Sequence, residues 1–111
     1  MNRIAAIALI VAGLFPSQAL ALSTQELLNA CQSKKGSDDN LFCLGYVNGV
    51  ADAMGRLLGP DAKDRYCPTQ PTTYGAFQQA FVNWALRHPE KWSAIAFNGV
   101  NQALRATWPC P

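Results

Sequence analysis

Apolar side chains recur every three or four residues in four stretches of this chain, which is the spacing of one face of an α-helix. The longest stretch predicts a helix from about residue 41 to residue 58. Gly59 and Pro60 follow directly and predict the end of that helix. The apolar face of the predicted helix consists of Leu44, Val47, Ala51, Met54 and Leu58.

A shorter helix is predicted before this one. Ser23 and Glu26 form a capping box, in which a hydroxyl is followed three residues later by a carboxylate, so we expect a helix from there to Cys31. Residues 33–40 are polar and contain a glycine, which predicts a loop. Within that loop, residues 38–40 are suited to cap the following helix.

Two further helices are predicted in the second half of the chain. Thr72 or Thr73 caps a third helix that reaches Arg87. Pro89 suits the first position of a fourth helix, which continues to Trp108. No alternation long enough for a strand occurs, so the sequence predicts an all-α domain of four helices. The apolar stripes of the last two helices are Tyr74, Phe77, Phe81, Trp84 and Ala85, and Trp92, Ile95, Ala96, Gly99, Ala103 and Leu104.

The first 21 residues have the order of a secretory signal peptide. Arg3 gives a positive start, residues 4–15 are apolar or small, and Ala19 and Ala21 form an A-x-A cleavage pattern. A membrane anchor is the alternative, but an apolar run of this length makes only about 18 Å of helix. We therefore expect cleavage after Ala21, export to the periplasm and a helical domain of residues 22–111.

The charge of the predicted domain argues against two classes of partner. The chain has nine basic and seven acidic side chains, and removal of Arg3 leaves eight basic residues, for a net charge of +1. Lysines and arginines are not clustered. We therefore expect neither nucleic acid nor, once the signal peptide has been removed, a membrane as partner.

The four cysteines predict two disulfides, since the domain is exported and their number is even. Zinc is the alternative, but no two cysteines have the close spacing of zinc ligands. Cys31 ends the first predicted helix and Cys43 lies near the start of the second, so a helical hairpin brings them together. If helices three and four also run antiparallel, Cys110 returns to Cys67. On the loop-entropy relation these closures contribute about 3 and 4 kcal/mol.

The residues with chemical potential do not form a catalytic pattern. His88 is the one histidine, and its place before Pro89 favours capping of a chain reversal over proton transfer. The carboxylate pairs Asp38/Asp39 and Asp61/Asp64 lie in polar loops, where solvation or capping is their expected role. We expect no enzyme activity, no metal site and no cofactor.

A row of small residues marks the second predicted helix. Gly45, Gly49 and Ala53 recur every four residues, which allows another backbone to approach closely. Packing within the chain is the favoured interpretation, and a dimer contact is the alternative. Asp52 is expected beside this row, with a slight preference for an internal hydrogen bond. Tryptophans are expected in the core.

Several short motifs resemble those of the Rap/Tai family of type VI secretion immunity proteins. The segment from Cys43 to Asp52 resembles that family's C-x-G-Y-x-x-G-x-x-D pattern, with Gly45, Tyr46 and Gly49 at the matching positions. Further matches follow in the family's order along the chain: Cys67-Pro68, Gln78 or Gln79 with His88-Pro89-Glu90, Ala103-Leu104, and Trp108-Pro109-Cys110.

This resemblance implies a periplasmic, α-helical and often dimeric protein that binds a toxin delivered by a type VI secretion system. The toxins of characterised members are peptidoglycan amidases, whose active-site cleft the immunity protein fills. The motif residues are cysteines, glycines and residues at helix joints, which are structural in kind. Binding specificity is therefore expected in the exposed loops 33–40 and 61–70. The partner-binding candidates there are Lys34, Lys35, Asp38, Asp39, Asp61, Lys63 and Arg65. A periplasmic stress or chaperone-like protein is the alternative function.

Overall fold

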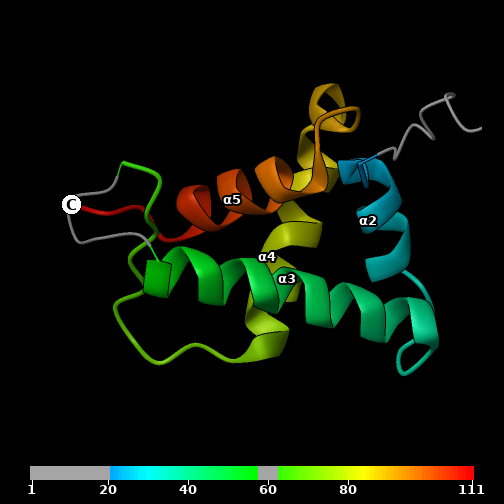
Figure 1. Cartoon of the computed structure of the whole chain (residues 1–111), viewed down its shortest axis with the longest axis horizontal. Coiled ribbons are helices and arrows are strands. Elements are labelled where there is room, and N and C mark those ends of the chain that lie inside the picture. Colours follow the sequence, from blue (N-terminus) through cyan, green and yellow to red (C-terminus); the bar gives the residue numbers. More distant parts are fainter. Residues whose placement is uncertain (1–20, 58–62) are drawn as a thin grey trace, which may run out of the picture.

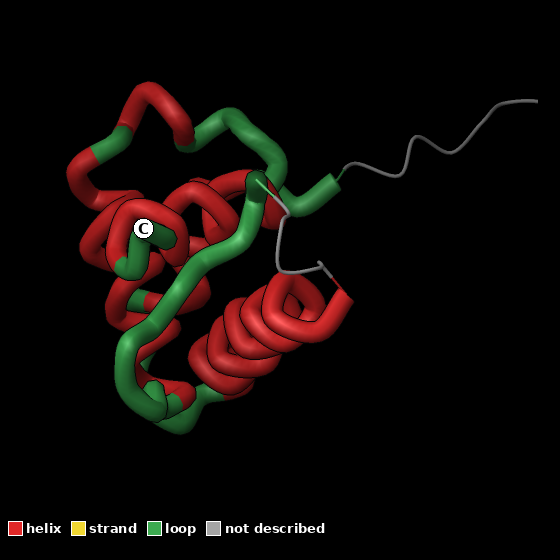
Figure 2. Tube along the Cα trace, turned by 90° about the vertical axis from the view of Figure 1, so that its left-hand side faces the viewer, coloured by secondary structure: helices red, strands yellow, loops and turns green. Residues whose placement is uncertain are grey.

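The protein consists of helices joined by loops. The computed structural model describes residues 21–57 and 63–111, which form α2 (Thr24–Cys31), α3 (Asp38–Leu57), α4 (Tyr74–Arg87), the short 3-10 helix η1 (Pro89–Lys91) and α5 (Ala96–Thr107) (Figure 1). Figure 2 shows helices and loops over this part of the chain, without a strand. The prediction of an all-α domain with four α-helices is thus confirmed. Residues 1–20, with most of the predicted signal peptide, and Leu58, Gly59 and Pro60 lie outside the described residues.

Hydroxyl side chains begin three of the four helices. Ser23 Oγ accepts a hydrogen bond from the Glu26 amide at 3.1 Å, as the capping box predicts, and Thr73 Oγ1 caps α4 at the same distance. The start of α3 differs from the expectation, because this helix begins at Asp38 rather than near Leu41. Ser37 Oγ accepts from the Asn40 amide at 3.2 Å, so Ser37 provides the capping hydroxyl.

The last α-helix begins seven residues later than predicted. Pro89 starts η1 instead, and α5 starts at Ala96. The intervening backbone pairs with residues at the start of α2: the Thr24 amide donates to Ala94 O at 2.8 Å, and the Ala96 amide donates to Leu22 O at 2.8 Å. These hydrogen bonds hold the segment outside the helix, since Ala94 O and the Ala96 amide already have partners.

The core lies where the four α-helices meet. In Figure 1, α3 and α5 lie side by side and α4 crosses behind them. The third and fourth α-helices pack against each other as expected, but they cross, so the expected antiparallel direction is wrong. The η1 segment provides the change in direction between α4 and α5. The described chain contains no helix that is long and apolar enough to cross a membrane. The largest fully buried side chains are Phe81, Leu27, Leu28, Met54, Leu104, Val47 and Val100.

Two disulfides fix the ends of this arrangement, and their pairs are those expected from the sequence. Cys31 and Cys43 join the end of α2 to α3, and both are buried. Cys67 and Cys110 join the connector after α3 to the C-terminal segment. Figure 2, viewed from the C-terminal side, shows this connector as the long loop across the molecule. The Cys67 amide donates to Trp108 O at 2.8 Å, which fixes the two segments side by side.

Candidate partner-binding site

The predicted partner-binding residues fall into two groups at opposite ends of α3. The first group lies in the turn between α2 and α3 and in the first turn of α3, and its side chains are exposed: Lys34, Lys35, Asp38 and Asp39. Lys63, which is exposed, and Arg65, which is half-buried, follow the other end; Asp61 lies outside the described residues. A helix of 20 residues spans about 30 Å. The two groups therefore belong to separate surfaces.

The side of α3 that faces away from the core, called here the outer face, is exposed and partly apolar. Leu41 and Phe42 are 54% and 50% exposed at its start. Gly45 and Gly49 follow, and a Cβ atom placed on either would meet nothing within 4 Å. Among the described residues, therefore, no other segment packs on these glycines, and the interpretation of the glycine row as internal packing is wrong. The side chain of Asp52 is also exposed, so the expected internal role for its carboxylate is not observed.

A groove adjoins the outer face, between the α2–α3 turn and the start of α4. Tyr74 borders it and is 64% exposed, although the sequence pattern places this residue on the apolar stripe of its helix. The discrepancy arises because Tyr74 is the first residue of α4 and projects past the core. Leu41, Leu44 and Tyr74 line both this groove and a hollow over Gly45 and Gly49. The groove is lined by Cys31, Gln32, Ser33, Lys35, Gly36, Asn40, Leu41, Leu44, Tyr74, Gly75, Gln78, Gln79 and Val82.

His88 has contacts of a structural kind. It is the C-terminal capping residue of α4, and its ring stacks on Trp84 with 4.5 Å between centroids. Its Nδ1 lies 2.7 Å from Trp84 O. Because a carbonyl oxygen only accepts hydrogen bonds, Nδ1 is the donor in this contact. The ring thereby stabilises the chain reversal before Pro89.

Tyr46 and Trp108, two further motif residues, also contact the core. Tyr46 is half-buried; burial raises the pKa of its phenol, and a hydrogen bond with the Phe97 backbone partly offsets that increase. Trp108 packs against Phe77 and Tyr66, with ring centroids 5.4 and 6.4 Å apart. Pro109 is exposed and follows directly. The motif residues of α3 lie on two sides of this helix. Tyr46 points inward, whereas Gly45, Gly49 and Asp52 lie on the outer face.

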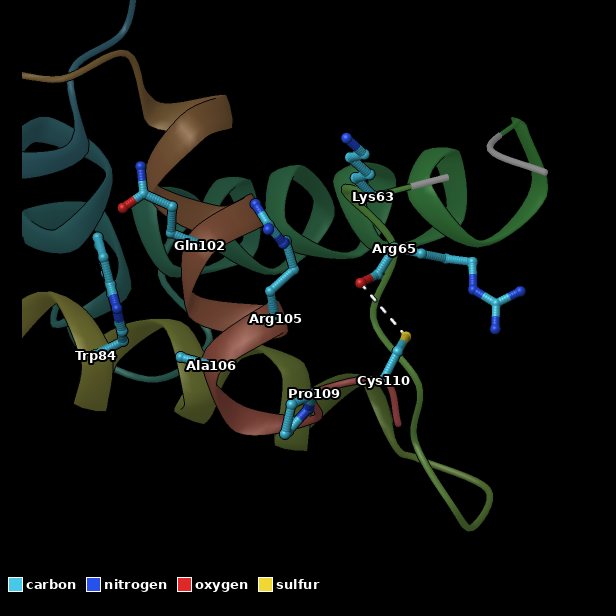
Figure 3. Close-up of a pocket in the computed structure, with 8 residues that line it drawn as sticks. All are labelled: Lys63, Arg65, Trp84, Gln102, Arg105, Ala106, Pro109 and Cys110. Carbon is cyan, nitrogen blue, oxygen red and sulfur yellow. Dashed lines mark hydrogen bonds between the residues drawn. The ribbon is translucent and has the colours of Figure 1, made fainter. Parts of the chain in front are cut away.

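A second pocket lies near the C-terminus, and the sequence pattern did not predict it. Lys63, Arg65 and Arg105 line it together with Cys110 (Figure 3). Arg105 forms an ion pair with Asp64 at 3.2 Å, and both side chains are exposed to solvent. The long separation between residues 63 and 105 explains why sequence spacing could not reveal this cluster. The rest of its lining consists of Trp84, Gln102, Ala106 and Pro109.

The described residues contain no arrangement typical of catalysis or metal binding. Three or more histidine, cysteine or acidic side chains do not gather anywhere in the described ranges. All four cysteines are paired in disulfides. The exposed apolar outer face and its groove are therefore the candidate site, and their chemistry is that of a protein-binding surface.

Comparison with known proteins gives the family. The model of the Rap1a immunity proteins matches residues 23–110, which include all four helices, both disulfides and the outer face of α3. Neither the curated proteins nor the solved structures compared with the chain include a match. An immunity protein acts by binding rather than by catalysis. The chain belongs to the Rap1a immunity protein family, and it is not an enzyme.

Proposed function

We propose that this protein binds a cognate type VI secretion toxin, a peptidoglycan amidase, in the periplasm and covers its active site. Membership of the immunity protein family supports a toxin as partner. The two disulfides support folding outside the cytoplasm, because such bonds persist in oxidising compartments. The amidase is inferred from the motif resemblance, and the periplasm is the compartment in which an amidase would meet peptidoglycan.

The outer face of α3 and the adjoining groove form the proposed toxin-binding surface. The observation that carries this assignment is that the exposed side chains of Leu41 and Tyr74 line the same groove. The exposed ring of Phe42 follows Leu41 in the first turns of α3. Large side chains of this kind are typical anchors of protein interfaces. Each glycine in a helix costs about 1 kcal/mol relative to alanine. Gly45 and Gly49 gain no internal contact in return, which favours contact with a partner.

Charged side chains border this apolar surface at the α2–α3 turn. Lys34 and Lys35 precede α3, and Asp38 and Asp39 lie in its first turn; all four are exposed. An apolar centre with a charged margin is the usual organisation of a protein interface. We propose that these residues select the cognate toxin, because charges at a margin affect partner discrimination more than they affect total affinity.

A second copy of the chain is the other candidate occupant of the outer face. The glycines leave the helix surface flat, so two copies of α3 could approach closely across Gly45 and Gly49. Light scattering on the purified protein without toxin distinguishes the cases. A dimer that dissociates when toxin is added would assign one surface to both partners, whereas a dimer that persists in the complex would assign the outer face to the copy and the groove to the toxin.

Matched variants on α4 test the surface. Tyr74 and Leu86 are both exposed apolar residues of this helix, at its opposite ends. We expect Tyr74→Ala to weaken toxin binding by about 30-fold, as for an interface anchor, and Leu86→Ala to leave it unchanged. Calorimetry with the toxin measures both variants. Equal effects would contradict the assignment of the surface.

The partner itself is tested by the product of a neighbouring gene that encodes a small secreted hydrolase with catalytic cysteine and histidine. We expect that protein to cleave peptidoglycan and this chain to inhibit the cleavage. Cells that contain both proteins in the periplasm should therefore survive. Absence of a complex and of protection would contradict the immunity function. In that case a chaperone-like protein would instead show partial unfolding and unselective binding of apolar peptides at acid pH.

A further inference from the structure

The two disulfides differ in their access to solvent. Cys31 and Cys43 are 7% and 0% exposed and belong to the core. Cys67 is half-buried, and Cys110 is exposed at the edge of the C-terminal pocket. A reagent in solution can therefore reach Cys110 while the Cys31–Cys43 pair stays covered. Access of this kind is the first requirement for thiol–disulfide exchange.

The pocket beside Cys110 is positively charged. Among the described residues that line it, Lys63, Arg65 and Arg105 are cations and none is acidic. Figure 3 shows the Cys110 sulfur facing the backbone oxygen of Arg65, whereas the side chains of Lys63 and Arg105 extend away from this sulfur. That sulfur lies 3.6 Å from Arg65 O. Asp64 partly offsets the charge of Arg105 through their exposed ion pair, so Lys63 and Arg65 are the cations of the lining that have no ion pair among the described residues. Such cations raise the local concentration of anions.

The other sulfur of this disulfide has a cation of its own. Arg65 Nη2 donates to Cys67 Sγ at 3.1 Å. A guanidinium at this distance stabilises negative charge on the sulfur, so Cys67 is suited to leave as a thiolate. Exchange is faster when the departing thiolate is stabilised. The structure thus places an exposed cysteine at a pocket lined by cations and a stabilised leaving group behind it.

We propose that this pocket is a site where an anionic thiol attacks Cys110 and opens the Cys67–Cys110 disulfide. The thiolate forms a new S–S bond with Cys110 Sγ, the old S–S bond breaks, and its electron pair leaves on Cys67 Sγ beside Arg65. A second thiolate then attacks the mixed disulfide, which releases the oxidised small disulfide and leaves Cys110 as a thiolate. Two thiols supply the two electrons. The Cys31–Cys43 disulfide stays closed, and the inference is independent of the toxin.

Three small thiols of different charge test the proposal on the folded, oxidised protein. The probes are 2-mercaptoethanesulfonate, which is anionic, 2-mercaptoethanol, which is neutral, and cysteamine, which is cationic, at equal thiolate concentration. Rapid acid quenching, alkylation and peptide mapping report which cysteines have been reduced. We expect Cys67 and Cys110 to be labelled about tenfold faster than the other pair. The sulfonate is expected to reduce the Cys67–Cys110 disulfide about tenfold faster than cysteamine does. This difference in rate should become smaller as the salt concentration rises.

Three variants separate the two parts of the site. Lys63→Ala combined with Arg105→Ala should reduce the advantage of the sulfonate, whereas Arg65→Met should slow all three thiols. Lys91→Ala, which removes an exposed cation in η1, is the matched control and should change neither rate. Equal labelling of both cysteine pairs in the wild-type protein, or equal rates for the anionic and cationic thiols, would overturn the proposal. The wild-type comparison needs no variant to fold.

Discussion

Gly99 of α5 packs directly against Thr24, the first residue of α2. A Cβ atom on Gly99 would lie 2.5 Å from Thr24 Oγ1 and 2.9 Å from Thr24 Cγ2. Thr24 cannot move away easily, because it is fully buried and its hydroxyl donates to Ala94 O at 3.0 Å. Gly99 is therefore required by packing, in contrast to Gly45, which has open space beside it.

Alanine at these two glycines should have opposite effects on stability. We expect Gly99→Ala to lower the free energy of unfolding by about 1–3 kcal/mol, the usual cost of overpacking. Gly45→Ala should raise it by about 0.5–1 kcal/mol, because alanine favours the helix and meets no obstacle. Urea denaturation of the monomeric protein measures both. A Gly99→Ala variant as stable as the wild type would show that Thr24 yields to the new methyl group.

The hydrogen bond and the burial of Tyr66 make the stability of the protein depend on pH at high pH. The Tyr66 hydroxyl donates to Ala51 O at 3.1 Å. Burial raises the pKa of this phenol above its ordinary value of 10.0, and the charge of Asp52 adds to the increase. Between pH 10.0 and the higher pKa of the folded state, the folded protein therefore retains the phenol proton of Tyr66, whereas the unfolded chain releases it. Stability should consequently decrease as the pH rises through 10 and the folded-state pKa.

The variant Tyr66→Phe tests this dependence on pH. Near neutral pH it should lower the free energy of unfolding by about 1 kcal/mol through loss of the hydrogen bond. Above pH 10 the decrease of stability with pH should be less steep in the variant than in the wild type. Tyr74→Phe, at an exposed ring, is the control. An identical slope in Tyr66→Phe and wild type would contradict the assignment.

The elements show which features local sequence can predict. Caps act over three residues, so Ser23 could be recognised from spacing alone, and the cap of α4 could be narrowed to Thr72 or Thr73, of which the structure shows Thr73. The start of α5 could not be predicted, because it depends on the hydrogen bond from the Ala96 amide to Leu22 O, which joins distant parts of the chain. The glycine row of α3 was recognised, but the pattern could not show which side of it other segments occupy. The candidate site was therefore found in part: the loop charges were predicted and the exposed Tyr74 was not.

An indole hydrogen bond helps to hold the joint between α4 and α5. Trp92 Nε1 donates to Ala85 O at 2.8 Å, which connects the segment after η1 back to α4. Trp92→Phe keeps most of the ring but removes this donor, so we expect a loss of about 1 kcal/mol in unfolding free energy. Hydrogen exchange should increase mainly in residues 89–95. Unchanged exchange there would show that the hydrogen bonds with residues 22–25 hold the joint alone.

At the scale of the whole molecule, one disulfide lies near each end of α3. Cys31 lies in the wall of the groove, next to the proposed toxin-binding surface. Cys110 lies in the positive pocket near the C-terminus. Because α3 spans about 30 Å between these ends, events at one end need not disturb the other. This separation would allow thiol exchange at Cys110 to change stability without changing the toxin-binding surface.

Serine variants of each disulfide test that separation. Cys67→Ser with Cys110→Ser should lower the free energy of unfolding by about 4 kcal/mol, since this disulfide closes the longer loop, and the folded fraction should bind toxin with wild-type affinity. Cys31→Ser with Cys43→Ser should cost about 3 kcal/mol by the same relation and should also weaken binding, because it loosens the groove. Urea denaturation and calorimetry at a temperature where each variant is folded measure both quantities. Weaker binding by the Cys67/Cys110 variant would place part of the toxin-binding surface at the C-terminal end, and the two ends of α3 would then act as one interface.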